Sequence, residues 1–80
     1  MPLREKRPTL VITFDATTQA LAAEQLLQRA GMPGRLIPVP REITAGCGLA
    51  WKAEPAAREA LTAALDGAGI LWTAAQVITI

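Results

Sequence analysis

The sequence predicts an α+β domain in which one antiparallel sheet carries two helices on the same face. Short runs rich in β-branched and apolar residues alternate with two longer segments whose apolar residues recur at helical spacing. Glycines and prolines separate these segments, and their order is βαββαβ. A proline inside the second run restricts that strand to a sheet edge, because proline has no N–H group to donate to a second neighbour.

The first strand is expected at residues 9–14, where β-branched residues follow a proline and Leu10, Ile12 and Phe14 share one face. A helix follows it and runs to about Ala30, because Gly31 favours a helix end. Its candidate N-caps are Asp15, Thr17 and Thr18. Its predicted buried stripe is Ala20, Ala23, Leu26, Leu27 and Ala30.

The second half of the chain supplies two more strands around a second helix, after a short edge strand at residues 35–39 that contains Pro38. Residues 49–53 alternate as a third strand should, and Trp51 on this strand is interpreted as a core residue. Pro55 suits the first helical position, and Gly67 or Gly69 ends the helix. The predicted apolar stripe of this helix is Ala57, Ala60, Leu61, Ala64, Leu65 and Ala68. The last strand is expected at residues 76–80.

This order of elements is the ferredoxin-like arrangement, whose usual strand order is 4-1-3-2. That order places the proline-bearing second strand at an edge, so the topology and the proline agree. We therefore expect residues 9–80 to form a single domain and residues 1–8, with Arg4, Lys6 and Arg7, to form a flexible basic tail.

The composition excludes several classes of function. The chain of 80 residues has a net charge of +1, which gives no general attraction to nucleic acid or to an anionic membrane. It has no histidine and one cysteine, so one chain can form neither an internal disulfide nor a Cys/His zinc site. No apolar run is long enough for a membrane span or a signal peptide. We expect a cytoplasmic protein without a metal or cofactor, and a small alanine-rich core that dimerisation would help.

The single cysteine, Cys47, lies between Gly46 and Gly48 in the loop before the third strand. In the predicted topology this loop shares one end of the sheet with the start of the first helix near Thr17. The free N–H groups and positive dipole end of that helix would favour a thiolate, while the negative end of the second helix near Gly67 would oppose it.

Neighbouring residues could act in the same direction. Arg41 is a permanent cation, and Gly46 and Gly48 can turn backbone N–H groups toward one anion. Glu42 would oppose them if it pointed inward. The alternative remains that Cys47 is a buried filler, because free cysteine is among the most buried residue types.

Other chemistries fit the residues poorly. A cysteine hydrolase needs a base, and a dithiol reductase needs a second cysteine. RNA binding on the sheet would need exposed aromatic residues and a basic surface, and phosphate binding at residues 46–48 would rest on a three-residue pattern without a Walker lysine.

With Cys47 in view, the chain resembles a family of small bacterial selenium or sulfur carrier-like proteins over residues 9–80. The features that carry the resemblance are Thr13-Phe14-Asp15 with Thr17 and Thr18, Glu24, the run at residues 36–41, and above all Gly46-Cys47-Gly48-Leu49. Asp15 stands where a small polar residue is often expected in the family.

The resemblance implies that Cys47 accepts sulfur or selenium as a persulfide or perselenide and passes it to an acceptor protein. The donor would be a protein such as a cysteine desulfurase, and Arg41, Gly46, Gly48 and Thr17 would stabilise the anionic adduct. Such a protein is a carrier and not a self-sufficient enzyme. Two alternatives stay open: a binding or regulatory module that holds a small anion or partner peptide at Arg41 and the glycine loop, and an oligomerising domain with Cys47 buried.

Overall fold

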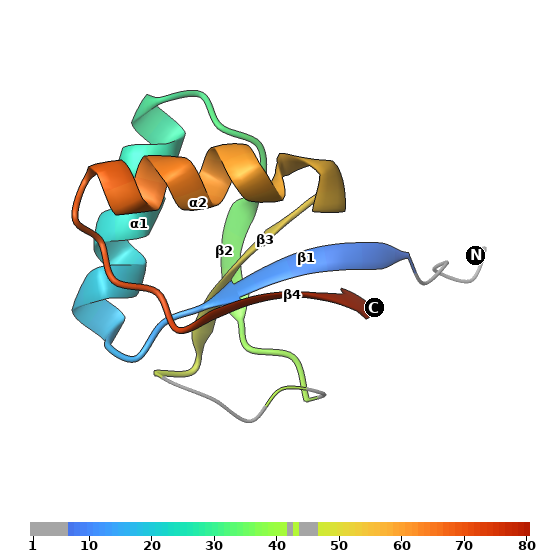
Figure 1. Ribbon diagram of the computed structural model, residues 1–80. Coiled ribbons are helices and arrows are strands. Elements are labelled where there is room, and N and C mark those ends of the chain that lie inside the picture. Colours follow the sequence, from blue (N-terminus) through green and yellow to red (C-terminus); the bar gives the residue numbers. More distant parts are fainter. Residues whose placement is uncertain (1–6, 42, 44–46) are drawn as a thin grey trace.

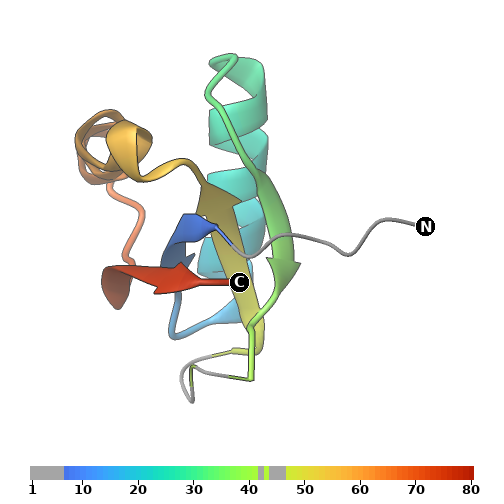
Figure 2. The ribbon, with the colours of Figure 1, turned by 90° about the vertical axis from the view of Figure 1, so that its right-hand side faces the viewer.

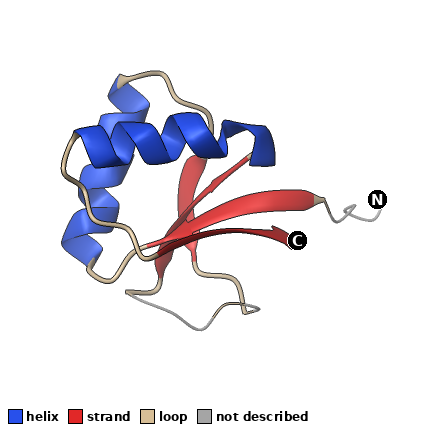
Figure 3. Cartoon of the chain, in the orientation of Figure 1, coloured by secondary structure: helices blue, strands red, loops and turns tan. Residues whose placement is uncertain are grey.

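The computed structural model describes residues 7–41, 43 and 47–80, which form a four-stranded sheet with two α-helices packed on one face (Figures 1 and 3). The elements are β1 Pro8–Thr13, α1 Thr17–Arg29, β2 Arg35–Pro38, β3 Leu49–Ala53, the 3-10 turn η1 Pro55–Ala57, α2 Arg58–Gly67 and β4 Ala74–Thr79. This confirms the predicted α+β class and the order βαββαβ. In Figure 2 α1 lies behind β2 and β3, and α2 is seen nearly end-on.

The strand order is β2-β3-β1-β4, and each pair of neighbours is antiparallel. This is the ferredoxin-like order that the sequence predicts, with β1 between β3 and β4. The prediction that the proline-bearing strand lies at an edge is also confirmed, because β2 pairs with β3 alone and Pro38 is its last residue.

The core lies between the sheet and the helices and is built around β1. Leu10, Ile12 and Phe14 are fully buried in this core, as their alternation predicts. Trp51 on β3 is also fully buried, and its indole N–H donates to the carbonyl oxygen of Pro33 at 3.1 Å. The indole therefore contributes both apolar area and a satisfied polar group to the core, which confirms its interpretation as a core residue.

The helices bury narrower stripes than the sequence predicts. In α1 the buried residues are Ala20, Ala23 and Leu27, and in α2 they are Leu61 and Leu65. Ala30 and Ala68 are exposed C-cap residues, and Ala60 is exposed as well. Leu61 and Leu65 are the residues through which α2 buries apolar area, because the single methyl group of each alanine adds little.

The predicted N-caps of α1 are wrong. Ala16 occupies the N-cap position, and among the residues that the structure describes no side chain caps the helix. The carboxylate of Asp15 instead accepts a hydrogen bond from the hydroxyl of Thr73 at 2.9 Å, so it joins the start of α1 to the segment that enters β4. Nothing in the local sequence signals this bond, because its partners are 58 residues apart.

Several boundaries also differ from the sequence prediction. β1 begins at Pro8, and the second helix begins with the 3-10 turn η1 before α2. β2 ends at Pro38, one residue before the predicted end. β4 begins two residues early, at Ala74, because Thr73 donates its N–H to the carbonyl oxygen of Thr13 at 2.8 Å and the pairing with β1 continues from there.

The sheet face turned away from the helices carries a second, smaller apolar cluster. Val11 and Ala50 are fully buried on this face, and they are clustered with Ile43 of the loop between β2 and β3. The partly buried residues packed against them are Ile37, Val39, Ile78 and Ile80. The loop therefore contributes to the fold as well as carrying Cys47.

Gly34 permits the close approach of the α1–β2 connection to β3. Its φ is +110°, and a Cβ atom there would collide with the carbonyl oxygen of Lys52 and the indole nitrogen of Trp51. We expect Gly34→Ala to lower the free energy of unfolding by about 3 kcal/mol, measured by urea denaturation. Gly31→Ala is the control, because Gly31 has a φ of +67° but no atom within 4 Å of the added carbon, and it should cost about 1 kcal/mol. Equal losses in both variants would contradict the collision.

Thr13 is fully buried, and its hydroxyl has no hydrogen-bond partner among the residues that the structure describes. Replacing it by an isosteric apolar residue removes an unsatisfied group, so Thr13→Val should raise the free energy of unfolding by about 1 kcal/mol. Thr9→Val on the same strand face should lower it by about the same amount, because the Thr9 hydroxyl donates to the carbonyl oxygen of Arg7 at 3.0 Å. A loss of stability in Thr13→Val would contradict this account.

Candidate functional site

Cys47 is held by its main chain at the junction between β1 and α1. Its N–H donates to the carbonyl oxygen of Phe14 at 3.0 Å, three residues before the first residue of α1. On the other side, Val39 donates its N–H to the carbonyl oxygen of Gly48 at 2.9 Å, which closes the loop between β2 and β3. The cysteine and the start of α1 therefore share one end of the sheet, as the topology predicts (Figure 1).

The thiol of Cys47 lies at the edge of the core. The side chain is half-buried and packs against the main apolar cluster, and its sulfur makes a long contact of 3.9 Å with the carbonyl oxygen of Leu49. This environment is intermediate between the two interpretations of the sequence, a buried filler and a freely exposed thiol. The sulfur is partly sheltered, while its main chain is fixed.

The first turn of α1, near this junction, has N–H groups without a partner inside the helix. Gln19 and Ala20 both donate their N–H groups to the carbonyl oxygen of Ala16, at 3.1 Å each. The turn has no side-chain cap and no acidic residue, so the N–H groups of Thr17 and Thr18 have no partner within the helix. Thr17 itself is exposed.

The other predicted site residues are only partly brought together. Arg41 is exposed in a turn closed by the N–H of Ile43, which donates to the carbonyl oxygen of Pro40 at 3.0 Å. Gly48 is exposed with a φ of +88°, a conformation that favours glycine over any other residue. Gly46 and Glu42 lie outside the described residues. Within the described part of the chain, no hydrogen bond links the side chain of Arg41 or Thr17 to Cys47.

Three tethers near this end of the sheet were missed by the sequence reasoning. The side-chain oxygen of Gln19 accepts the N–H of Leu71 at 3.0 Å, and the carboxylate of Asp66 accepts the indole N–H of Trp72 at 2.9 Å. The bond from Thr73 to Asp15 is the third. Together they fasten the connection from α2 to β4 against both helices. Only the Asp66 pair, six residues apart, leaves a signal that is local in the sequence.

Among the residues described, no group of three or more Cys, Asp or Glu side chains is arranged to hold a metal ion. In the same part of the chain, no helix combines the length and the apolar character needed to cross a bilayer.

A protein-family model described as "Putative Se/S carrier protein-like" matches residues 9–75. The chain belongs to this family. The match runs from β1 into β4 and includes Cys47, which confirms the resemblance drawn from the Gly-Cys-Gly motif. No curated protein and no solved structure matches the chain significantly.

The half-buried thiol leads to a prediction about its reactivity. Because the sulfur is partly sheltered but lies at the edge of the core, iodoacetamide should alkylate Cys47 in the folded protein about tenfold more slowly than in urea. Mass spectrometry of intact protein measures both rates, and Cys47→Ser serves as the blank. A folded-state rate lower by about a thousandfold or more would mean that the thiol reacts only after unfolding.

Proposed function

We propose that this protein is a carrier that accepts sulfur or selenium on Cys47 and delivers it to an acceptor protein. The observation that carries the proposal is the placement of the only cysteine, whose N–H is bonded to Phe14 at the β1–α1 junction while its side chain stays half-exposed. Membership of the Se/S carrier-like family supports it. A carrier needs a thiol that is fixed in position yet open to two partners in turn.

The loading step is a nucleophilic displacement at sulfur. The Cys47 thiolate attacks the terminal sulfur of a donor persulfide, a new S–S bond forms, and the S–S bond of the donor breaks. The donor cysteine leaves as a thiolate, and Cys47 becomes Cys47–S–S⁻. With a donor selenosulfide the product is Cys47–S–Se⁻. Atoms and electrons balance without an oxidant, because the transferred atom brings its oxidation level with it.

Delivery repeats the same displacement with the roles reversed. A nucleophile of the acceptor attacks the terminal sulfur or selenium, and Cys47 leaves as a thiolate. A second cysteine beside Cys47 would attack the inner sulfur of the adduct, form a disulfide with Cys47 and expel the cargo as free sulfide or selenide, and the chain contains no second cysteine. One cysteine is therefore what a carrier requires, whereas a dithiol reductase needs two.

The surroundings of Cys47 support a role in holding the anionic adduct. We assign that role to the cation of Arg41, to the backbone of Gly46 and Gly48, and to the helix start at Thr17, whose N–H group has no partner in α1. Gly48 has no side chain that could cover the backbone there, and its φ of +88° is one that glycine adopts readily.

The proposed partners are a donor, such as a cysteine desulfurase, and an acceptor protein, and the proposed compartment is the cytoplasm. A reducing compartment suits a chain with a single cysteine, because no structural disulfide is needed.

The proposal predicts an adduct that can be weighed. After incubation with a cysteine desulfurase and cysteine, the intact protein should gain the mass of one sulfur atom, and a reductant should remove it. With selenocysteine and a desulfurase that accepts it, the gain should be one selenium atom. Cys47→Ser should show no gain, and absence of an adduct on the unmodified protein, under conditions that load another carrier, would contradict the proposal.

The lifetime of that adduct tests the residues around it. Arg41→Gln should still load but lose the adduct about two- to fivefold faster, because an exposed cation stabilises a nearby anion only modestly. Arg29→Gln, at the far end of α1, is the control of equal charge change and should leave the half-life unchanged. Equal half-lives in all three proteins would remove Arg41 from the proposed site.

A further inference from the structure

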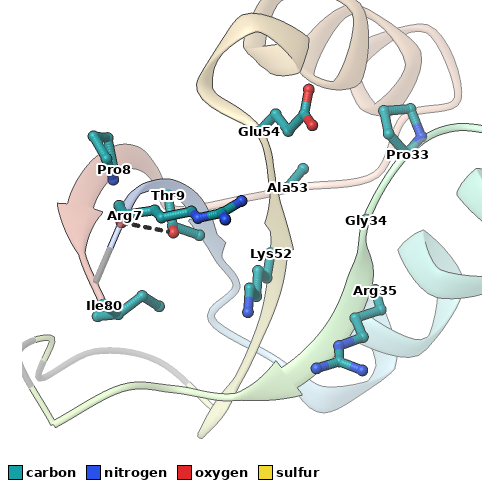
Figure 4. A pocket seen from close by; sticks show the side chains of 10 residues that line it. All are labelled: Arg7, Pro8, Thr9, Pro33, Gly34, Arg35, Lys52, Ala53, Glu54 and Ile80. Carbon is teal, nitrogen blue, oxygen red and sulfur yellow. Dashed lines mark hydrogen bonds between the residues drawn. The ribbon is translucent and has the colours of Figure 1, made fainter. Parts of the chain in front are cut away.

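A basic groove lies at the end of the sheet opposite to Cys47, on the face turned away from the helices (Figure 4). Its volume is about 630 Å³, within the usual range for ligand pockets. Among the residues that line it are Arg7, Arg35, Lys52, Glu54 and Ile80. Cys47 is bonded to Phe14, past the far end of β1, so roughly 17 Å of strand separates the groove from the thiol.

Two of the cations in this groove lie side by side on adjacent strands. Arg35 of β2 and Lys52 of β3 are direct register partners. Side chains at such positions have Cβ atoms about 5 Å apart, and like charges placed there repel each other. In the part of the chain that the structure describes, neither side chain forms a hydrogen bond to a carboxylate. An anion bound between them would relieve the repulsion.

The backbone of the third cation, Arg7, is held by hydrogen bonds. Its N–H and carbonyl groups exchange hydrogen bonds with Ile80, at 3.0 and 3.1 Å, and its carbonyl oxygen also accepts the hydroxyl of Thr9. Figure 4 shows Lys52 between Arg7 and Arg35, with the carboxylate of Glu54 directed away from Lys52 and Arg35. The groove thus presents three cations along neighbouring strands and one side-chain carboxylate at its rim.

The spacing of the charges indicates the kind of ligand. Arg35 belongs to β2, Lys52 to β3, and Arg7 directly precedes β1, and neighbouring strands are about 4.8 Å apart, so the three cations start from backbone positions spread over three strands. An extended chain with several negative charges can pair each cation with an acidic group of its own, whereas a single carboxylate would have to share its oxygens among all three cations.

The nature of the face favours a peptide over a nucleic acid. The chain has three aromatic residues. Phe14 and Trp51 are fully buried in the main core, and the indole of Trp72 is bonded to Asp66, so none of them lines the groove. Single-stranded nucleic acids bind sheets through stacking on exposed aromatic rings, which this face does not offer. A peptide needs only the charges and an apolar contact such as Ile80, which lines the groove.

We propose that this groove binds an acidic, extended segment of a protein partner through Arg7, Arg35 and Lys52. The proposal does not depend on transfer of sulfur or selenium, because the groove and the thiol lie at opposite ends of β1. A partner held there would leave Cys47 uncovered.

The test is binding of a fluorescein-labelled oligoglutamate peptide, followed by fluorescence anisotropy at low salt. Binding should be saturable, should weaken as salt rises, and should be absent for an oligoglutamine peptide of the same length. The double variant Arg35→Gln with Lys52→Gln should raise the Kd at least about tenfold. Arg29→Gln with Arg58→Gln removes the same charge from the helices and should change it less than about twofold.

Three results would overturn the proposal. The first is no saturable binding of oligoglutamate, and the second is an equal loss of affinity in both double variants, which would reduce the effect to net charge. The third is tighter binding of a single-stranded oligonucleotide of equal charge. Folding of the groove variant is checked by urea denaturation, where relief of the Arg35–Lys52 repulsion should leave the midpoint unchanged or higher. A lower midpoint would contradict the repulsion on which the proposal rests.

Discussion

The burial of β1 on both faces is the constraint on which the rest of the structure depends. This strand pairs with β3 on one side and β4 on the other, so its backbone groups are satisfied by two neighbours. Leu10 and Ile12 face the helices, while Val11 is clustered with the loop residue Ile43 on the other face. All three residues of the strand are fully buried. In so small a domain, few other side chains can supply this much buried apolar area.

The two proposed sites lie at opposite ends of this strand. Just beyond its carboxyl end, Phe14 accepts the hydrogen bond that positions Cys47. At its amino end, Arg7 forms backbone hydrogen bonds with Ile80 and lines the basic groove. The central strand β1 therefore keeps the side chain of Cys47 and the basic groove apart. In a carrier, this separation would let one end hold a partner while the other exchanges the cargo.

The sequence predicted the fold well and the site only in part. The strand order followed from the βαββαβ order of the elements, whose usual arrangement is 4-1-3-2, and Pro38 agreed with it because an edge position is a local property of a strand. The N-caps failed because Asp15 is drawn away by Thr73, which is remote in sequence. The groove was missed, although Arg35 and Lys52 lay in strands that the sequence had already paired as neighbours.

By itself the sequence determined the ferredoxin-like topology, the family through its Gly-Cys-Gly motif, and the limit that one cysteine without histidine sets on the chemistry. Tertiary structure alone decided that Cys47 is half-buried and tied to Phe14, that Asp15 pairs with Thr73, and that Arg35, Lys52 and Arg7 share one groove. The physical reason is the range of the interactions. Periodicity and turn preferences act over a few residues, whereas the exposure of a thiol and the meeting of charges depend on how distant segments pack.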